Sequence, residues 1–166
     1  MRVVVPYTDL KTETIGALNA TGRPWEPVWV GDSDEDYWSL LAGLWADGES
    51  FCIVEHDVVV EPDVFVELEA CPSDWCGFPV PYFRGSYAGL ACAKFGDELI
   101  ARNPRAVVRA GEMSNARHPR KHWCTLDHFL QREVLAQRNE VRCIHPRVLG
   151  HIRDGDVYRP SHDCHD

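Results

Sequence analysis

No stretch of this 166-residue sequence approaches the roughly 20 consecutive apolar residues that a membrane-spanning helix needs. The first residues form only a short β-branched run, which is typical of a strand rather than of a secretory signal. The sequence also lacks the density of Lys and Arg that characterises a dedicated nucleic-acid-binding protein. We therefore expect a soluble protein with no transmembrane segment.

A matched set of disulfide cysteines is also missing, because the seven cysteines are an odd number. Cys52, Cys92 and Cys143 stand in apolar surroundings, which is typical of reduced thiols in a cytoplasmic protein. The final run HDCHD has the residue types of a zinc site, but its spacing is too tight for closed tetrahedral coordination. We interpret residues 160–166 as a C-terminal tail and residues 1–159 as one domain, since a chain of this length suffices for one sizeable core.

Charge of both signs is present but unevenly distributed, and the net charge is −9. Residues 1–83 hold 16 acidic and 3 basic residues, whereas residues 84–159 hold 14 basic and 8 acidic residues. One interpretation is an acidic half that binds a metal ion and a basic half that faces an anion. The other is solvated surface with no binding role, and the sequence leaves both open.

The first 70 residues alternate between strand and helix patterns. Three β-branched or buried runs, at residues 2–5, 26–30 and 51–54, each precede a segment with helical spacing of apolar residues. We expect the first strand to stop at Pro6, the second helix to begin near Ser33, and the third to begin at Pro62. Three such repeats predict an open α/β sheet flanked by helices.

The second half gives weaker patterns. Residues 75–81 and 87–95 are typical of two strands joined by a turn at residues 84–86. Residues 102–122 contain two prolines, a glycine and several Lys and Arg residues, which predicts an irregular loop. Residues 122–135 have the apolar spacing of a helix, for which Thr125 is a suitable N-terminal cap.

Polar clusters follow the three predicted strands, at residues 6–9, 31–34 and 55–57. Ligands bind at the carboxyl ends of strands in open α/β sheets, so these clusters should meet at one edge. Strand alternation would direct Glu55 and Asp57 to one side and His56 to the other, so the two carboxylates can share a hard divalent cation. The alternative is a pair of solvated loop acids.

These segments resemble a known family. The order VVVPYTDLKTETIGALNA, VWVGDSDED and CIVEHDVVVEPD is similar to the nucleotide-binding half of GT-A-fold glycosyltransferases, especially family 2. The resemblance implies a single GT-A domain with a Rossmann-like open mixed sheet. It also makes residues 1–83 the nucleotide- and metal-binding half and residues 84–159 the acceptor half.

The resemblance further implies an activity: transfer of a sugar from a nucleotide diphosphate donor to a hydroxyl acceptor, with inversion, using Mn²⁺ or Mg²⁺. The donor-nucleotide contacts that it implies are Pro6, Tyr7, Thr8, Asp32, Asp34 and Glu55. The metal ligands that it implies are Asp57, Glu55 and His151. For Asp34 an alternative role is electrostatic stabilisation of a helix N-terminus, and for His151 a purely structural role.

Asp127 is the expected catalytic base, because family 2 enzymes place an acid near the start of such a helix to deprotonate the acceptor hydroxyl. The alternative is that a first-turn acid at this position stabilises the helix dipole. The acceptor class stays open between a sugar, a protein, a lipid and a modified nucleic acid, and so does the oligomeric state.

The sequence also departs from the family. Glu55 stands where the family's metal motif usually has Asp, and the chain is short, so elements that bind the acceptor should be reduced or supplied by a partner. Two other classes of protein stay open. A sugar-phosphate nucleotidyltransferase should have a glycine-rich phosphate loop after the first strand, which VVVPYTDLKTE lacks, and a non-catalytic nucleotide- or carbohydrate-binding module would need no base.

Overall fold

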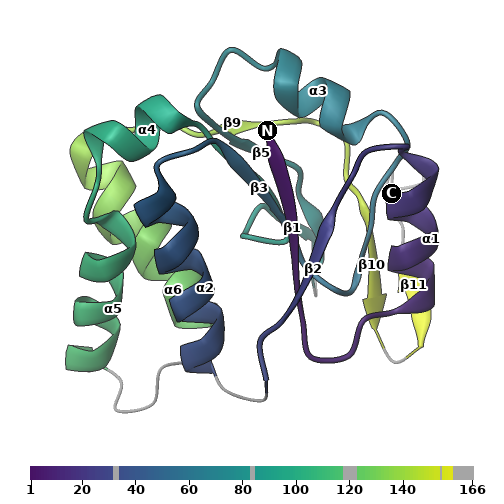
Figure 1. Cartoon of the computed structure of the whole chain (residues 1–166), viewed down its shortest axis with the longest axis horizontal. Coiled ribbons are helices and arrows are strands. Elements are labelled where there is room, and N and C mark those ends of the chain that lie inside the picture. The colour runs from purple at the N-terminus through teal and green to yellow at the C-terminus, as the bar shows by residue number, and fades with distance from the viewer. Residues whose placement is uncertain (32–33, 83–84, 118–122, 154, 159–166) are drawn as a thin grey trace.

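The computed structural model describes residues 1–31, 34–82, 85–117, 123–153 and 155–158 (Figure 1). The strands are β1 (Arg2–Tyr7), β2 (Glu26–Trp29), β3 (Phe51–Val54), β4 (Val58–Val59), β5 (Trp75–Gly77), β6 (Val80–Tyr82), β7 (Gly85–Tyr87), β8 (Cys92–Phe95), β9 (Cys143–Ile144), β10 (Gly150–Arg153) and β11 (Asp156–Tyr158). The helices are α1 (Thr12–Ala20), α2 (Asp34–Asp47), α3 (Val64–Ala70), α4 (Asp97–Arg102), α5 (Ala106–Arg117) and α6 (Trp123–His128). A π-helical segment, η1 (Phe129–Leu135), and a 3₁₀ turn, η2 (Ala136–Arg138), continue from α6.

The main sheet has six strands in the order β2-β1-β3-β8-β5-β9. β1 pairs in parallel with β2 and β3, β8 runs antiparallel between β3 and β5, and β9 pairs in parallel with β5. Helices lie on both sides of this sheet, with α2, α5 and α6 on one side and α1 on the other (Figure 1). The expected α/β fold, an open mixed sheet flanked by helices, is confirmed.

The core divides into two layers because alternate side chains of each central strand point to opposite faces of the sheet. Phe51 and Ile53 of β3 pack with α2, α5 and α6, whereas Cys52 and Val54 pack with α1 and α3. All four side chains are buried, so burial of each large one contributes about 1.5–3 kcal/mol. The uninterrupted apolar run of β3 is thus explained by helices on both faces.

A second sheet brings the end of the chain beside the end of β3. It has the order β11-β10-β4, and His151 of β10 pairs with Val58 of β4 in antiparallel register. The backbone N–H of Ile152 also donates to the carbonyl of Asp57 at 2.8 Å. His151 and the triplet at residues 55–57 are therefore neighbours despite their separation in sequence.

Three expected boundaries were wrong. β1 continues through Pro6 to Tyr7, and it does so because the pairing of β1 with β3 ends at Val4, so the missing N–H of proline interrupts no ladder on that side. The third helix begins at Val64 rather than at Pro62. The expected cap Thr125 lies inside α6, which begins two residues earlier.

The segment expected to be a loop, residues 102–122, is mostly helical, since α4 ends at Arg102 and α5 spans Ala106–Arg117. The first proline of the segment, Pro104, precedes the first turn of α5, where no backbone N–H is needed. The glycine, Gly111, packs against Trp38, whose ring atoms would lie 3.2 and 3.3 Å from an added Cβ. Residues 118–122 lie outside the described part of the chain.

The two strands expected at residues 75–81 and 87–95 are each divided. Their inner parts, β5 and β8, join the main sheet, and β6 pairs with β7 in a hairpin. β7 begins at Gly85, so residues 85 and 86 of the expected turn belong to a strand. Among the described residues, no helix combines the length and the apolar character that crossing a bilayer requires.

Candidate active site

The acidic triplet at residues 55–57 lies in a turn at the carboxyl end of β3. The backbone N–H of Val58 donates to the carbonyl of Glu55 at 3.1 Å, which closes the turn, and the N–H of Glu55 donates to the carbonyl of Ala91 at 2.9 Å. The alternation of an extended strand therefore does not apply to these residues, and the two carboxylates have different partners. They nevertheless interact, because the charge of Asp57 raises the pKa of Glu55.

The Glu55 side chain faces α2, where its Oε1 lies 3.3 Å from the hydroxyl of Tyr37. Burial raises the pKa of Glu55 to about 8, and the negative charges of Asp57 and Asp127 add to this effect. Without a compensating cation Glu55 therefore holds a proton at neutral pH. Three acidic groups thus converge here, and they require positive charge if all are to be ionised together.

Asp57 faces the second sheet. Its Oδ2 lies 3.1 Å from Nε2 of His151. Burial alone would raise the pKa of Asp57, but the hydrogen bond and the electrostatic interaction with His151 outweigh burial and lower it. The other carboxylate oxygen, Oδ1, is buried and has no hydrogen-bond partner among the described residues.

Asp127 is buried in α6, with only 5% of its surface exposed. The hydroxyl of Tyr87 donates to Oδ2 at 2.7 Å, and the side-chain amide of Gln131 donates to Oδ1. Burial raises the pKa of Asp127 to about 6, although the Tyr87 hydrogen bond and the charge of Arg142 oppose the rise. The fifth residue of α6 is beyond the first turn, so stabilisation of the helix dipole does not explain this acid.

Arg142 holds the loop that lies against Asp127. Its guanidinium donates to the carbonyl of Gly89 at 2.7 Å, to the carbonyl of Ala88, and to Oε1 of Gln131 at 2.5 Å. Gly89 is required here because an added Cβ would lie 2.5 Å from Oδ2 of Asp127. Gly89 therefore allows the backbone of this loop to lie close to the carboxylate of Asp127.

The loop after β1 lies against the acidic triplet. The backbone N–H of Lys11 lies 3.4 Å from the carbonyl of His56, and Tyr7 and Thr8 precede it at the end of β1. Tyr7 is half-buried and Thr8 is exposed, whereas Pro6 is buried. Asp32 and the side chain of Asp34 lie outside the described residues, so their expected nucleotide contacts stay predictions.

The carboxylates of Glu55 and Asp57, with the imidazole of His151, are the groups that could hold a hard divalent cation. The donor set fits, because the unpartnered Oδ1 of Asp57 and the mutual repulsion of Glu55 and Asp57 both favour a cation. Asp57 and His151 are in contact, but the three ligand atoms are not preassembled: among the described residues, the group of three or more acidic, histidine or cysteine side chains whose ligand atoms all lie within 4.8 Å of one another is Cys71, Cys143 and His145.

Four side chains of this site were not predicted from the sequence. They are Tyr37, Tyr87, Gln131 and Arg142. Each belongs to a different element from the carboxylate that it serves, except Gln131, which follows Asp127 by one helical turn. That i, i+4 spacing of an acid and an amide is the only local signal that could have indicated a contact.

No family model and no curated protein matches this chain. A solved structure that it resembles is a glycosyltransferase involved in the glycosylation of the major capsid of PBCV-1. The two share 11% sequence identity with a TM-score of 0.54, over 87% of this chain and 80% of the other. At this identity the likeness establishes a common fold alone.

Proposed function

We propose that this protein is a glycosyltransferase that moves a sugar from a nucleotide diphosphate donor to a hydroxyl acceptor. The observation that carries the proposal is the buried carboxylate of Asp127, whose negative charge raises the pKa of Glu55 at the carboxyl end of β3. A buried acid supported by Tyr87, Gln131 and Arg142 is suited to proton transfer. The shared glycosyltransferase fold supports the same reaction class.

In this mechanism Asp127 accepts the proton of the acceptor hydroxyl as its oxygen bonds to the anomeric carbon. The bond from that carbon to the donor phosphate oxygen breaks at the same time, and the nucleoside diphosphate leaves with the electron pair. With its pKa raised to about 6, Asp127 is ionised at neutral pH and is a stronger base than an ordinary aspartate. Tyr87, Gln131 and the backbone N–H of Leu90 fix the carboxylate, and the proton goes to the lone pair that these three donors leave open.

Glu55, Asp57 and His151 would hold Mn²⁺ or Mg²⁺, which would neutralise the charge of the departing diphosphate. Tyr7 and Thr8 would contact the nucleotide, because the loop that contains Thr8 adjoins the triplet at its Lys11–His56 contact. Inversion at the anomeric carbon accords with a single base and in-line displacement.

The test is a screen of nucleotide sugars by thermal shift and by donor hydrolysis, with and without Mn²⁺. A donor that raises the Tm only with metal, and that is hydrolysed, supports the proposal. Asp127→Asn should then retain donor binding and lose most turnover, since a general base contributes about 10²–10⁴-fold. Failure of every donor to stabilise the protein, or full turnover by the variant, would contradict it.

A further inference from the structure

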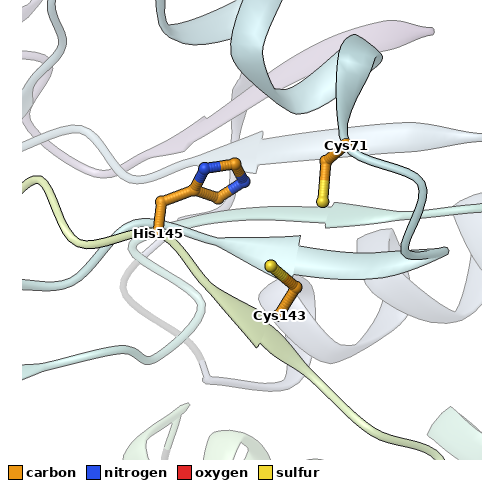
Figure 2. Close-up of side chains that lie close together, drawn as sticks. All are labelled: Cys71, Cys143 and His145. Carbon is orange, nitrogen blue, oxygen red and sulfur yellow. The ribbon is translucent and has the colours of Figure 1, made fainter.

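A cluster of cysteine and histidine side chains lies away from the carboxylates, between the end of α3 and the edge strand β9 (Figure 2). It consists of Cys71, Cys143 and His145, and its ligand atoms all lie within 4.8 Å of one another. Figure 2 shows the sulfur of Cys71, at the end of α3, facing the sulfur of Cys143 and the ring of His145, which come from β9 and the residue after it. Sulfur and imidazole ligands suit zinc rather than Mn²⁺ or Mg²⁺, so this cluster differs chemically from the proposed active site.

The imidazole of His145 is already held in place. The ring stacks on the buried ring of Phe78, with centroids 4.5 Å apart and planes 24° apart. Glu67 Oε2 lies 3.8 Å from Nδ1, and its negative charge favours the tautomer that carries the proton on that nitrogen. The other nitrogen, Nε2, is buried and has no hydrogen-bond partner among the described residues, and it faces the cysteines in Figure 2.

The sheet places further groups of the right kind beside the cluster. Cys76 of β5 is the direct register partner of Cys143 in β9, and its thiol interacts with that of Cys71. Lys94 of β8 is the register partner of Cys76 on the opposite edge of β5 from β9. Its ammonium donates to the carbonyl of Cys71 at 2.9 Å. The ammonium would balance the charge of a zinc ion bound by three thiolates and one neutral imidazole.

We propose that Cys71, Cys143 and His145 bind one zinc ion. Cys76, whose thiol contacts Cys71 but lies outside the group that is mutually within 4.8 Å, would move onto the metal as the fourth ligand. The site is structural, because four protein ligands leave no position for a substrate. Its role follows from β9, which has only two residues and pairs with a single strand. Zinc would fasten this edge strand to the end of α3.

The test uses the whole chain, reduced, freed of metal by a chelator, and titrated with Zn²⁺ alone. We expect one zinc per chain, a higher Tm with zinc, and reversal by chelator. Co²⁺ in place of zinc should give the thiolate-to-cobalt charge-transfer absorption and the strong visible bands of a tetrahedral site. A folded protein without that absorption overturns the proposal, and so does a Cys71–Cys143 disulfide that excludes the metal.

Single substitutions locate the site. Cys143→Ser and His145→Gln should abolish stoichiometric binding, and Glu67→Gln should weaken it by about 10- to 100-fold. Cys52→Ser is the matched control, because Cys52 is a buried cysteine on the same face of the sheet. Cys52 of β3 pairs with Lys94 on one side of β8, and Cys76 of β5 pairs with Lys94 on the other. Cys164→Ser tests whether the terminal HDCHD run takes the metal instead.

Circular dichroism of each variant shows whether loss of zinc follows from loss of the fold. Zinc binding that survives in folded Cys143→Ser and His145→Gln, or that Cys164→Ser abolishes, would contradict the assignment. None of these outcomes bears on sugar transfer, since the cluster shares no ligand with the carboxylate site. The two proposals therefore fail or succeed separately.

Discussion

Tyr87 donates a hydrogen bond of 2.7 Å to Oδ2 of Asp127, which connects β7 to α6 at the centre of the proposed active site. A phenolic donor stabilises the ionised carboxylate more than the protonated one, so this bond offsets part of the effect of burial on the pKa of Asp127. Tyr87 therefore sets the pH range in which Asp127 can act as a base.

Tyr87→Phe should raise the pKa of Asp127 above its value of about 6. A hydrogen bond to a charged group is worth about 1.5 kcal/mol or more, which corresponds to a rise of about one pH unit. The measurement is the dependence of kcat/KM on pH, whose acidic limb should move upward. Tyr37→Phe is the comparison, because Tyr37 bonds to Glu55 rather than to Asp127. An unmoved acidic limb in Tyr87→Phe would show that Asp127 is not the base.

Asp127→Asn should change how stability depends on pH. The folded pKa of about 6 exceeds the ordinary value of 3.8, so the folded state binds more protons than the unfolded state between these values. The stability of the parent protein, relative to that of the variant, should therefore fall as pH rises from about 4 to about 6, by about 3 kcal/mol in total. Urea denaturation of both proteins across this range, without metal or donor, measures the difference. A difference that does not vary with pH would contradict the burial of an ionisable group at this position.

Gly89→Ala should reduce both activity and stability. The added Cβ would lie 2.5 Å from Oδ2 of Asp127 and 2.6 Å from Cε1 of Tyr87, so both must shift. Overpacking of this kind costs about 1–3 kcal/mol, and displacement of the base should lower kcat more than it raises KM. Gly43→Ala is the matched control, since nothing lies within 4 Å of its added Cβ and Gly43 is inside α2. The control should be stabilised by about 0.5–1 kcal/mol.

Asp57→Asn should abolish the Mn²⁺-dependent part of donor binding. The substitution removes a negative charge and replaces one carboxylate oxygen with an amide that coordinates hard cations poorly. Isothermal titration with a donor nucleotide, with and without Mn²⁺, measures the effect. Asp47→Asn is the control, because Asp47 is an exposed acid that pairs with Arg2. Equal dependence on metal in both variants would remove Asp57 from the metal site.

The strand–helix repeats of the first half could be predicted because their signals are local. β3 is an uninterrupted apolar run, and α2 begins at Asp34, next to the expected start at Ser33, whereas α3 begins two residues after the expected Pro62. The predicted loop at residues 102–122 is wrong because Pro104 and Gly111 do not break the structure there. Pro104 instead precedes α5, and Gly111 makes room for the ring of Trp38, a long-range contact that no local pattern indicates.

The residues of the site also divide into those that the sequence indicates and those that only the fold brings together. The resemblance to GT-A enzymes assigned a role to Asp127, and strand position indicated Glu55 and Asp57. Tyr87 reaches Asp127 across 40 positions, and Arg142 reaches the carbonyl of Gly89 beside it across 53 positions. The same holds for Cys71 and Cys143, which only the end of α3 and the edge of the main sheet bring together.

The order of strands in the main sheet has a consequence for fragments of the chain. β3 borders β1 on one side and β8 on the other, so its second edge stays open until residues 92–95 are available. A polypeptide that ends before β8 would expose unpaired backbone groups of β3 beside Phe51 and Ile53, the pattern that promotes strand-to-strand aggregation. Truncations for expression should therefore end beyond β8, and nascent chains should become protease-resistant only after that strand leaves the ribosome.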